Sequence, residues 1–152
     1  MEIYRVSFIG HREVENFFHV EQEVDSIVRE LIKTKEYIEF YVGRNGEFDI
    51  LVASVIKRAK RDLGGCNSSL ILVIPYSVAE MEAYEKYYDD ILYPPELYNV
   101  HYKCAITKRN EWLVENSDLL IAYVTHDKGG AAHCLKKAIE RNIEIRLVNR
   151  HM

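Results

Sequence analysis

Short apolar runs alternate with longer segments of helical spacing, and this alternation continues along the whole chain. Five runs of aliphatic, β-branched or aromatic residues have the length and pattern of strands, at residues 4–9, 37–42, 70–74, 119–124 and 143–148. Between them, apolar residues recur every three or four positions and predict helices, at residues 20–31, 48–63, 78–88, 101–116 and 131–141. We expect residues 89–99 to form an irregular loop.

A strand followed by a helix, repeated along the chain, is typical of a parallel sheet with helices on both faces. We therefore predict an α/β fold, a Rossmann-like three-layer sandwich with a mainly parallel five-stranded sheet. The expected strand order is 3-2-1-4-5, which places the first and fourth strands side by side and the fifth near an edge. No linker or repeat interrupts the 152 residues, so we expect a single domain over residues 1–152.

The loop after the fourth strand carries the clearest chemical signal. It contains Gly129 and Gly130, and a predicted helix begins directly after them. Glycines let a ligand approach the backbone, and a helix N-terminus attracts anions through its free N–H groups and its dipole. In an open α/β sheet, ligands bind at the carboxyl ends of the strands where the strand order reverses. The sequence therefore predicts a site for phosphate or carboxylate, although a tight turn alone would also need these glycines.

The predicted ligand-binding residues come from the loops at this edge of the sheet and from one helix. They are Gly10, His11, Arg12, Gly43, Arg44, Gly46, Arg109, His126, Gly129, Gly130 and Ala131. A guanidinium group suits phosphate because it can donate paired hydrogen bonds, although each arginine could instead be a solvated surface residue. The two histidines lack a third ligand at metal spacing, so we expect hydrogen bonds to ligand or loop backbone, no metal and no cofactor.

Other polar and aromatic residues have competing interpretations. Asp49 could cap the helix that it begins or hold a ribose hydroxyl, and we favour the cap. Asp118 begins the fourth strand at the opposite end of the sheet, so we expect it to be structural. Cys134 lies near a helix N-terminus, where the pKa of a thiol tends to fall. The tyrosines within residues 84–102 could form a lid that stacks on a base, or an oligomer contact.

Composition bears on partners and compartment. The formal net charge is −4, which gives no global basic field for a nucleic-acid backbone, so we do not expect a nucleic-acid partner. Lys57, Arg58, Lys60 and Arg61 form a local basic cluster that we interpret as the solvated face of a helix. No apolar run is long enough to span a membrane. The three cysteines lack paired spacing and the start of the chain lacks a signal-peptide pattern, so we expect a cytoplasmic protein.

Four motifs together resemble the SLOG superfamily, the Rossmann-like group named after the Smf/DNA-processing proteins and the Lonely guy cytokinin-activating enzymes. They are Phe8-Ile9-Gly10-His11-Arg12, the turn at residues 43–49, Arg109, and the Gly129-Gly130 turn. The resemblance is greatest to a small bacterial branch with Gly-His-Arg after the first strand and His-x-x-Gly-Gly-Ala after the fourth. It implies a nucleotide or nucleotide-derived ligand in the crevice, and a homodimer or higher homo-oligomer, because relatives are commonly dimers.

Some members of the superfamily are phosphoribohydrolases that cleave a base from a ribose 5′-monophosphate. Their final motif reads Pro-Gly-Gly-x-Gly-Thr-x-x-Glu, whereas this chain has His133 in place of the threonine and Lys136 in place of the acidic residue. Because that carboxylate would act at the ribosyl centre, its loss argues against hydrolysis. We therefore predict a nucleotide-binding module or sensor without catalytic residues. The alternative is a phosphoribohydrolase-like enzyme with altered catalytic groups, in which Arg109 would act.

Overall fold

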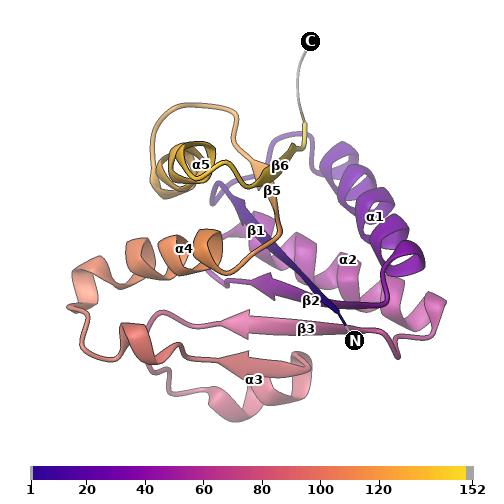
Figure 1. Cartoon of the computed structure of the whole chain (residues 1–152), viewed down its shortest axis with the longest axis horizontal. Helices are drawn as coiled ribbons and strands as arrows, with labels where there is room; N and C mark the ends of the chain where they lie inside the picture. Colours follow the sequence, from indigo (N-terminus) through magenta and orange to yellow (C-terminus); the bar gives the residue numbers. More distant parts are fainter. Residues whose placement is uncertain (1, 150–152) are drawn as a thin grey trace.

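The computed structural model describes residues 2–149, and strands and helices alternate through them (Figure 1). The strands are β1 (Ile3–Gly10), β2 (Tyr37–Val42), β3 (Ser68–Val73), β4 (Asp90–Leu92), β5 (Leu119–Tyr123) and β6 (Glu144–Leu147). The helices are α1 (Phe17–Thr34), α2 (Glu47–Leu63), α3 (Met81–Tyr87), α4 (Ala105–Glu115) and α5 (Gly130–Glu140). Two short 3-10 helices, η1 (Pro95–Leu97) and η2 (Tyr102–Cys104), precede α4.

All pairings in the sheet are parallel, and the strand order is β4-β3-β2-β1-β5-β6. The five predicted strands are present in the predicted order, with β6 at one edge, which confirms the α/β Rossmann-like fold. The difference is β4, which lies beside β3 at the other edge, within the segment that we expected to be a loop. Its 3 residues are too few for a periodic pattern to reveal.

The two faces of the sheet each carry a separate apolar core. One core contains the apolar stripes of α1 and α2 together with alternate residues of the strands, such as Phe8, Phe40 and Ile121. The other contains the buried residues of α4 and α5 with the intervening strand residues, such as Ile9 and Ala122. Successive strand residues therefore point to opposite cores, which is the three-layer arrangement seen in Figure 1.

Helix ends differ from the predictions in ways that local chemistry explains. α1 begins at Phe17, earlier than predicted. Its first residues are exposed and do not belong to the apolar stripe, so the spacing of apolar residues does not reveal them. α2 ends as predicted before Gly64, whose φ of 97° is the left-handed conformation that glycine adopts most readily. The helix predicted over residues 101–116 is divided into η2 and α4.

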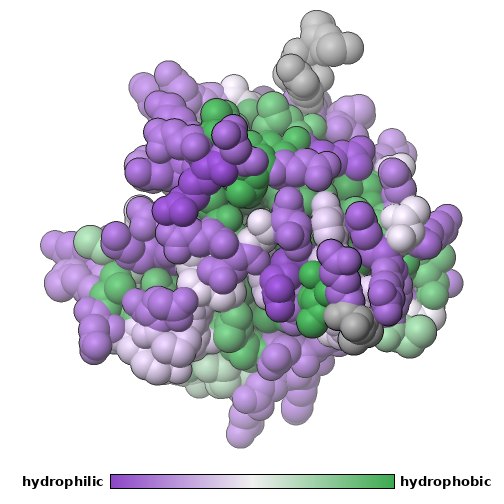
Figure 2. Space-filling view, in the orientation of Figure 1, coloured by the Kyte–Doolittle hydropathy of each residue, from purple (hydrophilic) through white to green (hydrophobic). Residues whose placement is uncertain are grey.

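On the face seen in Figure 2, hydrophilic residues cover most of the surface, and hydrophobic residues show in small groups. No helix within residues 2–149 is both long and apolar enough to cross a membrane.

Candidate functional site

A cavity of about 440 Å³ lies at the carboxyl ends of β1 and β5, next to the point where the strand order reverses. Its walls are the loop after β1, the loop between β2 and α2, the middle of α4 and the turn between β5 and α5. All of the predicted ligand-binding residues except Arg44 and Gly46 line it. The strand order thus brings together loops that are more than a hundred residues apart in the sequence.

Arg44 and Gly46 have other contacts. The guanidinium group of Arg44 lies 4.8 Å from the ring centre of Tyr84, and its Nη1 donates to the Tyr88 hydroxyl at 3.2 Å. A Cβ at Gly46 would lie 2.6 Å from the backbone of Arg12, and the next residue donates its N–H to the Arg12 carbonyl at 2.9 Å. Gly46 therefore lets the loops after β1 and β2 meet, and Arg44 is held toward the tyrosines.

Arg109 is the central polar residue of the cavity wall, with only 4% of its surface exposed. Its Nε donates to the Asn110 amide oxygen at 3.0 Å, Nη1 to the Val73 carbonyl at 2.9 Å, and Nη2 to the Asn45 amide oxygen at 2.9 Å. A guanidinium has five N–H donors, so one N–H on each terminal nitrogen has no partner among residues 2–149. Arg109 also makes no ion pair with any carboxylate of those residues, although burying an unpaired charge is costly.

Two glycines of the motifs make room for neighbouring side chains. A Cβ at Gly43 would lie 2.8 Å from Nη1 of Arg109, so the guanidinium rests directly on the Gly43 backbone. A Cβ at Gly10 would lie 2.4 Å from the ring of Phe48, which is fully buried. The need for glycine at both positions therefore follows from packing inside the protein, whatever occupies the cavity.

The turn before α5 is open. Gly129 has a φ of 93° and a ψ of 178°, a conformation almost restricted to glycine, and a Cβ there would meet nothing within 4 Å. The first turn of α5 has no acidic residue. The Asn110 amide nitrogen would be 3.9 Å from a Cβ on Gly130, while its oxygen accepts from Arg109. Amide N–H groups of Asn110 and the N-terminus of α5 thus face the same space.

The histidines connect the loops after β1 and β5. The rings of His11 and His126 stack with centres 3.8 Å apart and planes 7° apart. Nε2 of His11 accepts from the Thr125 backbone N–H at 3.0 Å, and Nδ1 of His126 accepts from the Lys128 N–H at 3.3 Å. These are the predicted hydrogen bonds to loop backbone. Burial and the neighbouring charge of His126 lower the pKa of His11, so its neutral, accepting form is favoured.

Acidic groups also line the cavity, and sequence reasoning missed this role for Glu13 and Glu15. Asp49 accepts from the Asn45 backbone N–H at 2.9 Å, one residue before the N-cap Gly46, so it fixes the loop before α2, and the predicted cap is not formed because α2 has no side-chain cap hydrogen bond. Burial raises the pKa of Asp49, and the positive charge of Arg109 acts in the opposite direction. The position of Asn110 at the cavity was also missed. Asn110 directly follows Arg109 on α4, and neighbouring positions on a helix do not normally face the same side, so the sequence gives no signal for it.

Two residues singled out in the sequence do not line the cavity. Asp118 accepts from the Arg5 backbone N–H at 2.9 Å at the opposite end of the sheet, so its predicted structural role is confirmed. The expectation for Cys134 was wrong, because burial raises the pKa of its thiol to about 12. The thiol lies inside the core between α4 and α5, where desolvation outweighs the helix dipole.

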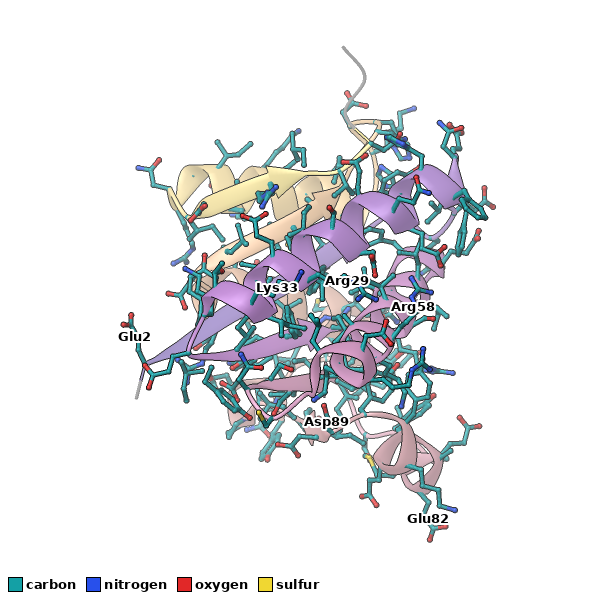
Figure 3. All side chains as sticks on the ribbon, turned by 90° about the vertical axis from the view of Figure 1, so that its right-hand side faces the viewer. Glu2, Arg29, Lys33, Arg58, Glu82 and Asp89 are labelled. Atoms are coloured by element: carbon teal, nitrogen blue, oxygen red, sulfur yellow. The ribbon has the colours of Figure 1, made fainter. Side chains whose placement is uncertain are left out.

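The basic cluster on α2 is paired with nearby acceptors. Figure 3 shows Arg58 beside α1, where its guanidinium lies 3.6 Å from Asp25 and 3.9 Å from Glu21. Lys60 pairs with Asp89 at 2.7 Å, and Lys57 donates to the Tyr87 carbonyl at 2.7 Å. This cluster lies on the helix face that we expected to be solvated, and the structure adds salt bridges to it.

Comparisons with known proteins place the fold. No family model and no curated protein sequence matches the chain. DNA processing protein A from Streptococcus pneumoniae has a TM-score of 0.70 at 14% identity over 99% of this chain and 52% of its own. DNA processing protein A from Helicobacter pylori has a TM-score of 0.66 at 16% identity over 98% and 66%. The molybdenum cofactor carrier protein from Chlamydomonas reinhardtii has a TM-score of 0.60 at 11% identity over 96% and 76%.

These similarities confirm the Rossmann-like α/β fold that the sequence predicts. This chain spans about half the length of the pneumococcal protein. The same fold serves a single-stranded DNA binding mode in the Helicobacter pylori protein and belongs to a cofactor carrier in Chlamydomonas reinhardtii.

One expectation about partners was wrong. We argued from the net charge of −4 that nucleic acid is not a partner, but the structures with this fold include a DNA processing protein A with a described single-stranded DNA binding mode. Net charge averages over the whole surface, whereas binding depends on the charges that face the ligand. In this chain Arg58 and Lys60 of the basic cluster on α2 pair with carboxylates, whereas a buried arginine lines the cavity, and net charge does not distinguish these two environments.

Proposed function

We propose that the cavity binds the phosphate of a nucleotide or nucleotide-derived molecule and that the protein acts as a binding module or sensor. The observation that carries the proposal is Arg109, a buried cation with two unused N–H donors and no ion pair among residues 2–149. An anion in the cavity would add to the nearby negative charge of Asp49 and accept these donors.

The surroundings of Arg109 support an anion of phosphate size. Its three hydrogen bonds fix the guanidinium group, so little side-chain entropy would be lost on binding. The N-terminus of α5 and the Asn110 amide nitrogen border the same space, and the Gly129 backbone is unobstructed. The exposed Arg12 and Lys128 lie at the cavity and add positive charge.

Calorimetry with a panel of nucleoside mono- and diphosphates, dinucleotides and ADP-ribose tests this proposal. A binder present at about 100 times its Kd would also raise the free energy of unfolding by roughly 2.7 kcal/mol. Arg109→Met should abolish binding, while Lys108→Met is the matched control, because Lys108 is an exposed neighbour on α4 that pairs with Glu111. Absence of any binder below about millimolar Kd, or equal binding by Arg109→Met, would refute the proposal.

Single-stranded nucleic acid is a second candidate ligand, favoured by the similarity to the Helicobacter pylori protein. A strand supplies the same phosphate group as a free nucleotide, but its affinity falls more steeply with salt because several phosphates release counterions. Fluorescence anisotropy with a labelled oligonucleotide, repeated at increasing salt and in competition with mononucleotides, separates the two.

A hydrolase remains the alternative activity, favoured by the carboxylates of Glu13, Glu15 and Asp49 along the cavity. A carboxylate can stabilise the positive charge that develops at a ribosyl carbon or activate water. These groups lie on the loop after β1 and the first turn of α2, whereas the enzymes of the superfamily place theirs on the final helix, where this chain has Lys136. We therefore propose that free base is not released, which chromatography of AMP, GMP, CMP, UMP and IMP after incubation tests.

A further inference from the structure

Tyr76 and Tyr102 form an aromatic pair at the carboxyl edge of the sheet. Tyr76 lies three residues after the end of β3, and Tyr102 is the first residue of η2, which leads into α4. The ring centres are 4.9 Å apart and the ring planes differ by 43°. Tyr102 is 69% exposed.

The two rings do not contribute to either core. Within residues 2–149, neither ring belongs to the two apolar clusters, and neither hydroxyl bonds to a group outside the pair. By contrast, the hydroxyl groups of Tyr88 and Tyr123 accept from Arg44 and from the Glu15 backbone. Core packing and hydrogen bonds to other segments thus explain the position of these other tyrosines, whereas the Tyr76–Tyr102 pair has neither.

The pair lies next to the cavity. Arg109 donates to the carbonyl of Val73, three residues before Tyr76, and Ile106, one helical turn after Tyr102, lines the cavity wall. Burial and the hydrogen bond with Tyr102 raise the pKa of Tyr76, and the positive charges of Arg109 and Arg12 act against that increase. An exposed aromatic surface therefore borders the cavity that Arg109 lines.

We propose that the Tyr76–Tyr102 pair is a stacking platform for the base of the ligand whose phosphate lies at Arg109 and the N-terminus of α5. This inference rests on the proposed function and specifies it, because it requires an aromatic base on the ligand. Every nucleobase has a flat π-face that stacks on tyrosine, and such stacking tolerates different bases. A platform built only from rings therefore favours nucleotides over sugar phosphates and discriminates weakly between bases.

Calorimetry with two probes separates the base from the phosphate. Wild-type protein should bind the best of AMP, GMP, CMP and UMP about 10-fold more tightly than ribose 5-phosphate, within the range that one base–aromatic stack provides. Tyr102→Ala should remove that difference and leave the Kd for ribose 5-phosphate unchanged, and Tyr102→Phe should restore it. Tyr98→Ala is the matched control, because Tyr98 is 57% exposed in a similar pair with Tyr93.

Each outcome decides the inference. If ribose 5-phosphate binds as tightly as the monophosphates, or if Tyr102→Ala binds the monophosphates like wild type, the platform is refuted while the phosphate site stands. If no probe binds wild-type protein but a short single-stranded oligonucleotide does, and Tyr102→Ala weakens it about 10-fold, the platform serves a strand. If wild-type protein binds none of these probes, both the platform and the proposed phosphate site are refuted.

Discussion

The two walls of the cavity are both rich in glycine, but they use it differently. On the wall formed by the loops after β1 and β2, a Cβ at Gly10, Gly43 or Gly46 would lie 2.4, 2.8 or 2.6 Å from another atom. On the wall formed by the turn before α5, a Cβ at Gly129 would meet nothing within 4 Å. The first wall needs glycine for internal packing, and the second needs it for backbone conformation and leaves space for a ligand.

Gly10→Ala should have the largest effect on stability. The added methyl group would overlap the buried Phe48 ring, and overpacking of a core typically costs 1–3 kcal/mol and occasionally more. We expect a loss of about 3 kcal/mol in the free energy of unfolding, measured by urea denaturation. A variant as stable as wild type would show that the first wall is not packed as described.

Gly129→Ala should destabilise the protein by a smaller amount and for a different reason. There is space for the methyl group, but a φ of 93° with a ψ of 178° is strained for alanine and costs about 1–3 kcal/mol. We expect a loss of about 2 kcal/mol in the same urea experiment. Gly64→Ala, which has a φ of 97° far from the cavity, is the matched control and should lose stability without changing ligand binding.

The layers of the fold could be predicted because periodicity records burial. The apolar spacing in α1 and α2 and the continuous run of β3 directly reflect the faces that those elements bury. β4 could not be predicted, because its pairing with β3 depends on backbone hydrogen bonds over only 3 residues. The division of the expected helix at residues 101–116 likewise follows from local turns, not from its apolar spacing.

The candidate site could be predicted only as far as its loops. Strand order alone brings Gly10, His11 and Gly129 to one cavity, so a pattern of elements was sufficient for them. The hydrogen bonds of Arg109 to Val73 and Asn45 could not be predicted, since they join residues 36 and 64 positions apart. For the same reason, nothing in the sequence distinguished the glycines that pack from the glycine that leaves space.

Gly130→Val should weaken ligand binding more than it weakens folding. Gly130 does not have a positive φ, and a Cβ there would make only an ordinary contact of 3.9 Å with Asn110. A branched side chain would however cover the first N–H groups of α5, and a hydrogen bond to a charged group contributes about 1.5–3 kcal/mol. We expect at least about a 10-fold increase in the Kd of a confirmed ligand, measured by calorimetry. Wild-type affinity in the purified variant would place the phosphate elsewhere.

The smallest expected effect concerns the contact between the two walls, which His11 makes through its stack on His126 and its hydrogen bond from Thr125. Because burial and His126 hold the pKa of folded His11 below its ordinary value of 6.5, the unfolded chain binds a proton more readily than the folded one. The contribution of His11 to stability is therefore complete above pH 6.5 and is lost as the pH falls from 6.5 through the lower pKa of the folded state.

Melting temperatures measured on both sides of that interval should show a decline toward acid that His11→Gln reduces. The control His19→Gln removes an exposed histidine that pairs with Glu23 outside the cavity, and it should keep the wild-type decline. An equal decline in His11→Gln and wild type would mean that protonation does not break the contact between the walls.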